Sequence, residues 1–235
     1  MIRTAAVLVL VSLVAAGDAP STSRTTCPSG AGPGRVAYLE GGALLVLQMP
    51  ACSSRVLVRR SAAPPVRWSA DGQYLAFGGG VVHVDSGRLF RGLRGSWSPR
   101  GHTLATISGR GGLVLRGPGL GARRLLSDGF GAQSVAFDRT GTRLAVGRAR
   151  PRGARAPANR EIWVVDVRTR ARRLVYRAHP ADPLTPVVRG WAPGGFVVFS
   201  RWLLPGSSAN LDGLPLLAVS AAGGDPREIV DAVLL

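Results

Sequence analysis

The sequence contains no lysine, only three glutamates and only two cysteines among its 235 residues. Two cysteines exclude a disulfide-dense fold, and an isolated pair lacks the two further ligands that a structural zinc site requires. So few glutamates argue against a pair of catalytic carboxylates. After the N-terminal segment, no stretch longer than a strand keeps an apolar period of 3.6 residues, which argues against a helical protein.

What the chain does contain is typical of short strands joined by frequent turns. It has 32 glycines and 17 prolines beside a hydrophobic fraction of 46%. Glycine and proline interrupt regular structure, whereas the apolar residues supply material for a core. A chain of this length can bury a substantial core without a metal ion. The composition therefore predicts one large all-β domain.

All of the formal positive charge on side chains is carried by arginine, and the net charge is +17. Such a surface attracts anions, including nucleic acid, lipid headgroups and acidic polymers. An alternative origin is codon bias, since a GC-rich genome depletes lysine and enriches arginine, alanine, glycine and proline. The positive charge has the same physical effect whatever the origin of the arginines, so we expect attraction to anionic polymers and to membrane surfaces. No nucleic-acid-binding motif is present, and we expect no specific nucleic-acid partner.

The N-terminus has the layout of a secretory signal peptide, which we assign to residues 1–17. Arg3 is followed by an apolar run from Ala5 to Ala16 and then by Gly17. This run is short for a bilayer span, which takes about 20 apolar residues. A retained anchor is the alternative. We expect an exported protein of the periplasm, the cell envelope or the extracellular space.

Export places the two cysteines, Cys27 and Cys52, in an oxidising compartment, where an isolated pair usually forms a disulfide. In the chain-entropy treatment this bond would stabilise the fold by roughly 3 kcal/mol. We expect it to tie an N-terminal segment, residues 18–34, to the domain formed by residues 35–235.

Four segments repeat one pattern, which consists of an aromatic residue, a turn containing glycine, and an apolar strand. They are Val66–Phe77 (VRWSADGQYLAF), Gly95–Thr106 (GSWSPRGHTLAT), Val135–Val146 (VAFDRTGTRLAV) and Arg189–Phe199 (RGWAPGGFVVF). The aromatic residue ends one buried strand, the turn reverses the chain, and the apolar residues form a second strand. Each segment therefore predicts a β-hairpin.

The repeated pattern resembles the TolB-like, WD-repeat-like β-propeller family, whose blades carry a Trp-Ser-Pro-Asp-Gly-x-x-Leu-Ala-Phe motif. Glu161–Val167 followed by Arg172–Leu174 resembles the third and outer strands of such a blade. The resemblance covers about residues 35–230 and implies an all-β propeller of five blades. The expected blades span about residues 35–60, 66–93, 95–127, 134–177 and 187–230. A loose β-sandwich is the structural alternative.

The first expected blade has only three strands and lacks the innermost one. The C-terminal residues 231–235 are mostly apolar. We expect Val233–Leu235 to pair beside Val36–Leu39 and to close the ring, because closure protects the strand edges. The alternative is a propeller that has lost further blades.

Residues that could carry chemistry are scattered along the chain. The glutamates fall away from the innermost strands, two aspartates are expected in hairpin turns, and the three histidines lie in different blades without metal-binding spacing. These residues are Glu40, Glu161, Glu228, Asp71, Asp138, His83, His102 and His179. We expect no catalytic residue, no metal site and no cofactor. Two alternatives stay open: a carbohydrate-active enzyme with carboxylates in a central funnel, and an accessory propeller related to prolyl-oligopeptidase-type proteins.

Two long connections, residues 148–160 in the fourth blade and 201–213 in the fifth, are expected on one face, because insertions in repeat proteins map to loops. One is a basic arm and the other has an apolar tip. The residues concerned are Arg148, Arg150, Arg152, Arg155 and Arg160 in the first and Trp202 and Leu203 in the second. We expect a monomeric binding scaffold whose partner is an acidic envelope protein or an anionic polymer. Solvated loops without a function are the alternative.

Overall fold

The computed structural model describes residues 33–60, 62–93, 95–117, 121–149, 160–182, 184–202 and 215–230. The expected signal peptide, Cys27 and the expected closing strand Val233–Leu235 lie outside the described residues. Cys52 is described and is not a free thiol, while its pairing with Cys27 stays a prediction. In the described part of the chain, no helix is long and apolar enough to cross a membrane.

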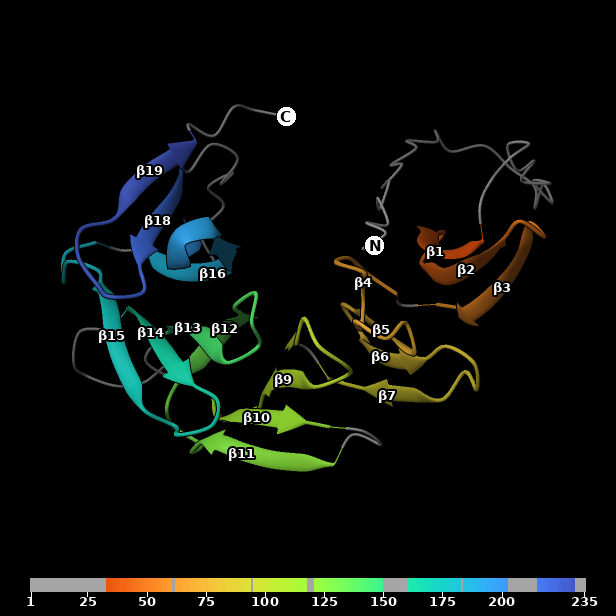
Figure 1. Ribbon diagram of the computed structural model, residues 1–235, viewed down its shortest axis with the longest axis horizontal. Helices are drawn as coiled ribbons and strands as arrows, with labels where there is room; N and C mark the ends of the chain where they lie inside the picture. Colours follow the sequence, from red (N-terminus) through yellow and green to blue (C-terminus); the bar gives the residue numbers. More distant parts are fainter. Residues whose placement is uncertain are drawn as a thin grey trace.

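The described residues form five antiparallel sheets, which follow one another along the chain and around an arc (Figure 1). The first sheet has three strands and each of the others has four, which confirms the predicted all-β propeller of five blades. Blade by blade, the strands are β1 (Gly34–Glu40), β2 (Ala43–Met49) and β3 (Ser53–Val58); β4 (Arg67–Trp68), β5 (Tyr74–Phe77), β6 (Gly80–His83) and β7 (Leu89–Arg91); β8 (Gly95–Trp97), β9 (Leu104–Ile107), β10 (Leu113–Arg116) and β11 (Ala122–Leu126); β12 (Ala132–Phe137), β13 (Arg143–Arg148), β14 (Glu161–Asp166) and β15 (Arg172–Arg177); β16 (Thr185–Ala192), β17 (Phe196–Trp202), β18 (Leu216–Ser220) and β19 (Arg227–Val230).

Each repeated segment forms the hairpin between the first and second strands of its blade, as predicted. In the second blade, Trp68 pairs with Leu75 across the hairpin. The turn needs a left-handed residue at the same place in three blades, where Gly72, Gly101 and Gly141 have φ angles of 70°, 64° and 74°. Glycine adopts this conformation without a steric penalty, which explains its recurrence in the motif.

The aspartate of the repeated turn organises the backbone around it. In the fourth blade, Asp138 accepts hydrogen bonds from the backbone amides of Thr142 at 3.0 Å and Arg143 at 3.1 Å, and from Arg143 Nε at 3.1 Å. Burial acts to raise the pKa of Asp138, but the hydrogen bonds from Arg143 and Thr140 and the charge of Arg143 hold it below its ordinary value of 3.8. The turn therefore favours the charged carboxylate.

The hydrophobic core lies between the blades. Four clusters of buried side chains join the five sheets in order, one at each junction. Two tryptophans of the repeats also bond across a junction. Trp97 Nε1 donates to the carbonyl oxygen of Arg67 at 3.2 Å, and Trp191 Nε1 donates to that of Ala136 at 3.0 Å. Each of these bonds joins the innermost strands of neighbouring blades.

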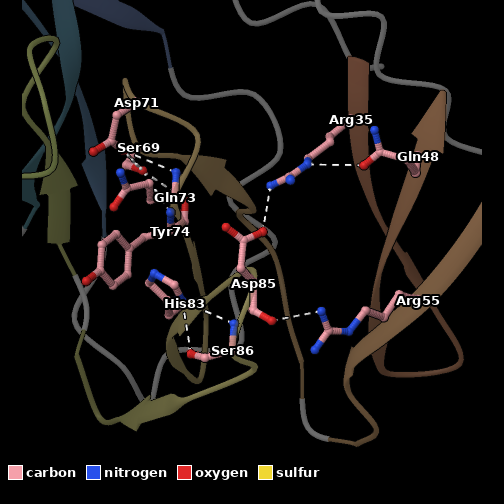
Figure 2. Close-up of polar contacts among 10 residues, drawn as sticks. All are labelled: Arg35, Gln48, Arg55, Ser69, Asp71, Gln73, Tyr74, His83, Asp85 and Ser86. Atoms are coloured by element: carbon pink, nitrogen blue, oxygen red, sulfur yellow. Dashed lines mark hydrogen bonds and ion pairs between the residues drawn. The ribbon is translucent and has the colours of Figure 1, made fainter. Parts of the chain in front are cut away.

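The junction of the first two blades also carries one surface ion pair and one hydrogen bond, which Figure 2 shows around Asp85. Arg35 Nη1 lies 3.1 Å from Asp85 Oδ1, and Arg55 Nη1 donates to the carbonyl oxygen of Asp85 at 3.0 Å. The Asp85 side chain is 64% exposed. An ion pair in that environment contributes at most about 1 kcal/mol, so the apolar cluster carries most of the stability of this junction.

Replacing Trp191 by phenylalanine removes the N–H that bonds to Ala136 and keeps an aromatic ring at the junction. A net hydrogen bond contributes about 1 kcal/mol, so we expect this loss to lower the melting temperature by about 2–4 °C in a chain of this size. Trp68→Phe is the matched control for ring size, because the Trp68 indole donates no hydrogen bond within the described residues. Equal shifts in calorimetry for the two variants would contradict the role assigned to the bond.

Candidate functional site

The ends of β13 and β17, from which the two long connections leave, lie side by side. A Cβ atom on Gly147 would lie 2.8 Å from the carbonyl oxygen of Pro186, and Pro186 pairs with Arg201 in the fifth sheet. Strand β13 ends at Arg148 and β17 ends at Trp202. Both connections therefore leave the fold at one face, which we call the loop-bearing face. The connecting residues 150–159 and 203–214 lie outside the described residues.

Arg148, the first arginine of the predicted arm, is held in place at the end of β13. Its Nε donates to the carbonyl oxygen of Phe130 at 2.7 Å, and its Nη1 donates to Glu161 Oε2 at 2.9 Å. Its guanidinium carbon lies 4.9 Å from the centre of the Phe130 ring, a distance at which cation and ring attract. The structure thus makes Arg148 an anchor at the base of the connection.

Glu161 is the residue around which the side chains at the start of this connection are arranged. Its side chain is 1% exposed, and a buried carboxylate needs nearby positive charge and hydrogen-bond donors. Oε2 accepts from Arg148 and, at 2.8 Å, from Trp163 Nε1, while Oε1 accepts from Arg177 Nε at 3.1 Å. The carboxylate therefore ties β13, β14 and β15 together at the edge from which residues 150–159 emerge. We call these four side chains the Glu161 network.

A second polar group lies at the base of the fifth-blade connection. Arg201 Nη1 lies 3.4 Å from Asp182 Oδ2, which links β17 to the connection before β16. Burial, together with the charge of Asp182, raises the pKa of Tyr176 above its ordinary value of 10.0. The Tyr176 ring packs 4.9 Å from the ring of Phe199. This aromatic contact between β15 and β17 joins the parts of the fourth and fifth blades from which the two long connections leave the fold.

Three buried polar atoms beside the two connections have no hydrogen-bond partner within the described structure. They are Arg160 Nε, Arg201 Nε and Thr185 Oγ1. Unpaired buried polar atoms are uncommon in folded proteins, because each loses its hydration without compensation.

The structure describes only part of the predicted arm and tip. Arg148 and Arg160 are described, Trp202 is described by its backbone alone, and the remaining residues, Arg150, Arg152, Arg155 and Leu203, lie outside the described residues. The role of Glu161 as the centre of a buried ion-pair network was not predicted from the sequence. A single glutamate before the apolar run Ile-Trp-Val-Val was the available signal, since an acidic residue in a buried strand requires partners.

The described strands on the central side of the arc lack the carboxylates that a glycosidase site needs. The innermost strands β4, β8, β12 and β16 contain neither aspartate nor glutamate. Their exposed long side chains are Arg67, Gln133 and Arg189. Among the described residues there is also no group of three His, Cys, Asp or Glu side chains that could hold a metal ion.

A serine, an aspartate and a histidine meet between the second and third blades. Ser69 Oγ donates to Asp71 Oδ1 at 2.7 Å and accepts from the backbone amide of Tyr74 at 2.9 Å, and the other oxygen of Asp71 bonds to His102 Nδ1. Figure 2 shows Ser69, Asp71 and Tyr74 within the second blade. A serine nucleophile needs a base on its own hydroxyl, which here bonds to Asp71 instead. The cluster therefore joins two turns and does not form a nucleophilic triad.

No protein-family model and no curated protein matches the chain. Among solved structures, hydrazine synthase of Kuenenia stuttgartiensis matches with 13% identity and a TM-score of 0.53, covering 80% of this chain and 60% of that one. A prolyl endopeptidase matches with 13% identity and a TM-score of 0.50, covering 84% and 36%. TolB from Acinetobacter baumannii matches with 12% identity and a TM-score of 0.48, covering 80% and 49%. At these identities the likeness shows the β-propeller fold alone, and this chain spans 60% or less of each protein.

Replacing Glu161 by alanine leaves Arg148, which is 26% exposed, without its counter-charge in a largely buried setting. Breaking a buried ion pair in this way costs roughly 3–5 kcal/mol, and we expect that loss in the free energy of unfolding measured with urea. Glu40→Ala is the matched control, because Glu40 is an exposed residue at the end of β1. We expect it to change stability by less than about 0.5 kcal/mol. Similar losses for the two variants would refute the structural role of the network.

Proposed function

We propose that this chain is a non-catalytic, exported binding scaffold that offers its loop-bearing face to an acidic envelope protein or an anionic polymer. The observation that carries the proposal is the Glu161 network. It fixes both ends of the 150–159 connection, since Arg148 precedes the connection and Glu161 follows it. A connection held at its base presents its remaining side chains with a smaller loss of entropy on binding.

The charge of the surface supports an anionic partner. The net charge is +17, and the first connection carries Arg150, Arg152 and Arg155 beyond its anchored base. Guanidinium groups match carboxylate and phosphate geometry, which favours an acidic partner over a neutral sugar. Trp202 at the start of the second connection adds an aromatic residue of the kind that often anchors an interface. No motif favours a specific nucleic acid.

The layout of residues 1–17 and the presence of two cysteines support export to the periplasm, the envelope or the extracellular space. The resemblance of the repeats to TolB-like blades agrees with that location. The same proposal includes the bond between Cys27 and Cys52. Mass spectrometry of the exported protein without reductant is expected to find cleavage after residue 16 or 17 and the linked pair of cysteine peptides. An uncleaved chain with two free thiols would contradict the proposed export.

The partner surface is tested by replacing Arg150, Arg152 and Arg155 with serine while Arg148 stays in place to hold Glu161. Immobilised poly-L-glutamate is the probe, and binding is measured by surface plasmon resonance over a series of salt concentrations. We expect the Kd at low salt to rise at least about tenfold and its salt dependence to flatten, because fewer ion pairs form. Trp202→Ala is expected mainly to raise the dissociation rate constant.

The control variant also loses three arginines, but it loses them from the opposite ends of the strands. Arg139, Arg168 and Arg170 are exposed residues in turns of the fourth blade, and their replacement by serine lowers the net charge equally. We expect this variant to keep most of its affinity for poly-L-glutamate. Equal losses in the two triple variants would mean that net charge alone drives binding, and no binding by the unaltered chain at low salt would overturn the proposal.

A further inference from the structure

The loop-bearing face continues from the fourth blade onto the third. The turn between β9 and β10 occupies the place in the third blade that the connection between β13 and β14 occupies in the fourth. In this turn, the carbonyl oxygen of Gly111 accepts a hydrogen bond from the backbone amide of Ala132 at 2.9 Å, and Ala132 pairs with Arg148 in the fourth sheet. The turn therefore lies directly beside the base of the first long connection.

Further backbone contacts join the third and fourth blades at this place. The amide of Gly129 donates to the carbonyl oxygen of Arg110 at 2.8 Å, and the amide of Ala149 donates to that of Gly131 at 3.0 Å. A Cβ atom on Gly131 would lie 2.5 Å from the carbonyl oxygen of Ala149, so the close approach requires glycine. These contacts hold Arg110 in a fixed position relative to the base of the connection.

The positive charge of Arg110 is not balanced within the described part of the chain. Arg110 is exposed and forms no ion pair with a described residue. The carboxylate of Asp128, at the same end of the third blade, already has partners. Its Oδ1 accepts from Ser108 Oγ at 2.7 Å, and its Oδ2 lies 3.4 Å from Arg124 Nη2.

The Glu161 network adds a second excess of positive charge. Its single carboxylate faces two guanidinium groups, with Arg148 Nη1 at 2.9 Å from Oε2 and Arg177 Nη2 at 3.0 Å from Oε1. The Arg177 side chain is 62% exposed, so this excess reaches solvent. Positive charge therefore extends across the junction of the third and fourth blades, even without the arginines of residues 150–159.

These charged positions follow one another in a row across the ends of the strands. Glu161 pairs with Arg148 on one side and with Arg177 on the other. Arg148 also pairs with Ala132, which bonds to Gly111 of the third blade. Neighbours joined by backbone hydrogen bonds lie about 4.8 Å apart, so the row from Gly111 to Arg177 is roughly 20 Å long. A single small anion can contact only part of such a row.

We propose that the loop-bearing face binds an elongated polymer with a negative charge on every unit, and that this polymer lies along the row from Arg110 to Arg177. The inference rests on the proposed function and selects the anionic polymer over a compact acidic protein as the partner. An extended polypeptide advances about 3.3 Å per residue, so about six consecutive acidic residues cover the row. Guanidinium groups along it then pair with successive carboxylates.

The length of the polymer is the first test. Oligo-L-glutamates of two and of twelve residues compete with immobilised poly-L-glutamate for the full chain at low salt, in surface plasmon resonance. We expect the longer peptide to inhibit binding at a carboxylate concentration at least about tenfold lower, because only the longer peptide can cover the row. Equal inhibition per carboxylate by the two peptides would overturn the proposal, since the carboxylates would then bind one at a time.

The second test asks whether the polymer reaches the third blade. Arg110→Ser is expected to raise the Kd for the twelve-residue peptide at least about threefold and to flatten its salt dependence, because one ion pair is lost. Arg100→Ser is the matched control, since Arg100 is an exposed residue in the turn at the opposite end of the same blade. We expect this control to leave the Kd unchanged. Circular dichroism checks that both variants are folded, and Arg110→Gln replaces Arg110→Ser if the latter is unstable.

The proposed function and the present inference fail on different results. Absence of binding to poly-L-glutamate by the unaltered chain would overturn both. If the chain binds and the replacement of Arg150, Arg152 and Arg155 weakens binding, the proposed function stands. Equal Kd values for Arg110→Ser and Arg100→Ser would then show that the partner contacts the arm alone, and the polymer along the row would be wrong.

Discussion

The packing of each sheet against the next holds this molecule together, and strand β5 shows how the sequence achieves it. All four of its side chains are buried. Leu75 and Phe77 belong to the cluster at the first junction, whereas Tyr74 and Ala76 belong to the cluster at the second. Because side chains alternate between the two faces of a strand, one short apolar run serves both neighbours. A single sheet of three or four short strands would leave such faces in water.

This arrangement also decides where charged groups can lie. A carboxylate within a strand that is buried on both faces must find its counter-charges on the strands beside it, because no water reaches it. Glu161 satisfies this condition at the first position of β14, with Arg148 on one neighbouring strand and Arg177 on the other. The cost of desolvating these charges is repaid only when every oxygen is bonded, which makes the geometry at the base of the connection specific.

The sequence predicted the parts of the fold that depend on local pattern. The aromatic residue, the left-handed glycine and the apolar strand act within about a dozen residues, so the four hairpins and the four blades that contain them could be predicted from the repeats. The bonds of Trp97 to Arg67 and of Trp191 to Ala136 could not, because they span 30 and 55 positions and depend on the spacing of the sheets. The pairing of Arg148 with Glu161 was missed because the long connection between them was interpreted as one basic arm.

The distribution of arginine protects the outer edges of the blades from pairing with the strands of another chain. Every outermost strand carries at least one arginine: Arg55 in β3, Arg91 in β7, Arg123 and Arg124 in β11, Arg172, Arg173 and Arg177 in β15, and Arg227 in β19. Charge on an edge strand discourages pairing with the edge of another chain. Edge-to-edge contact between blades of two copies would bring these charges together, and their repulsion disfavours such contact. The loop-bearing face lies at the ends of the strands, so a partner that binds there does not have to pair with a charged edge strand.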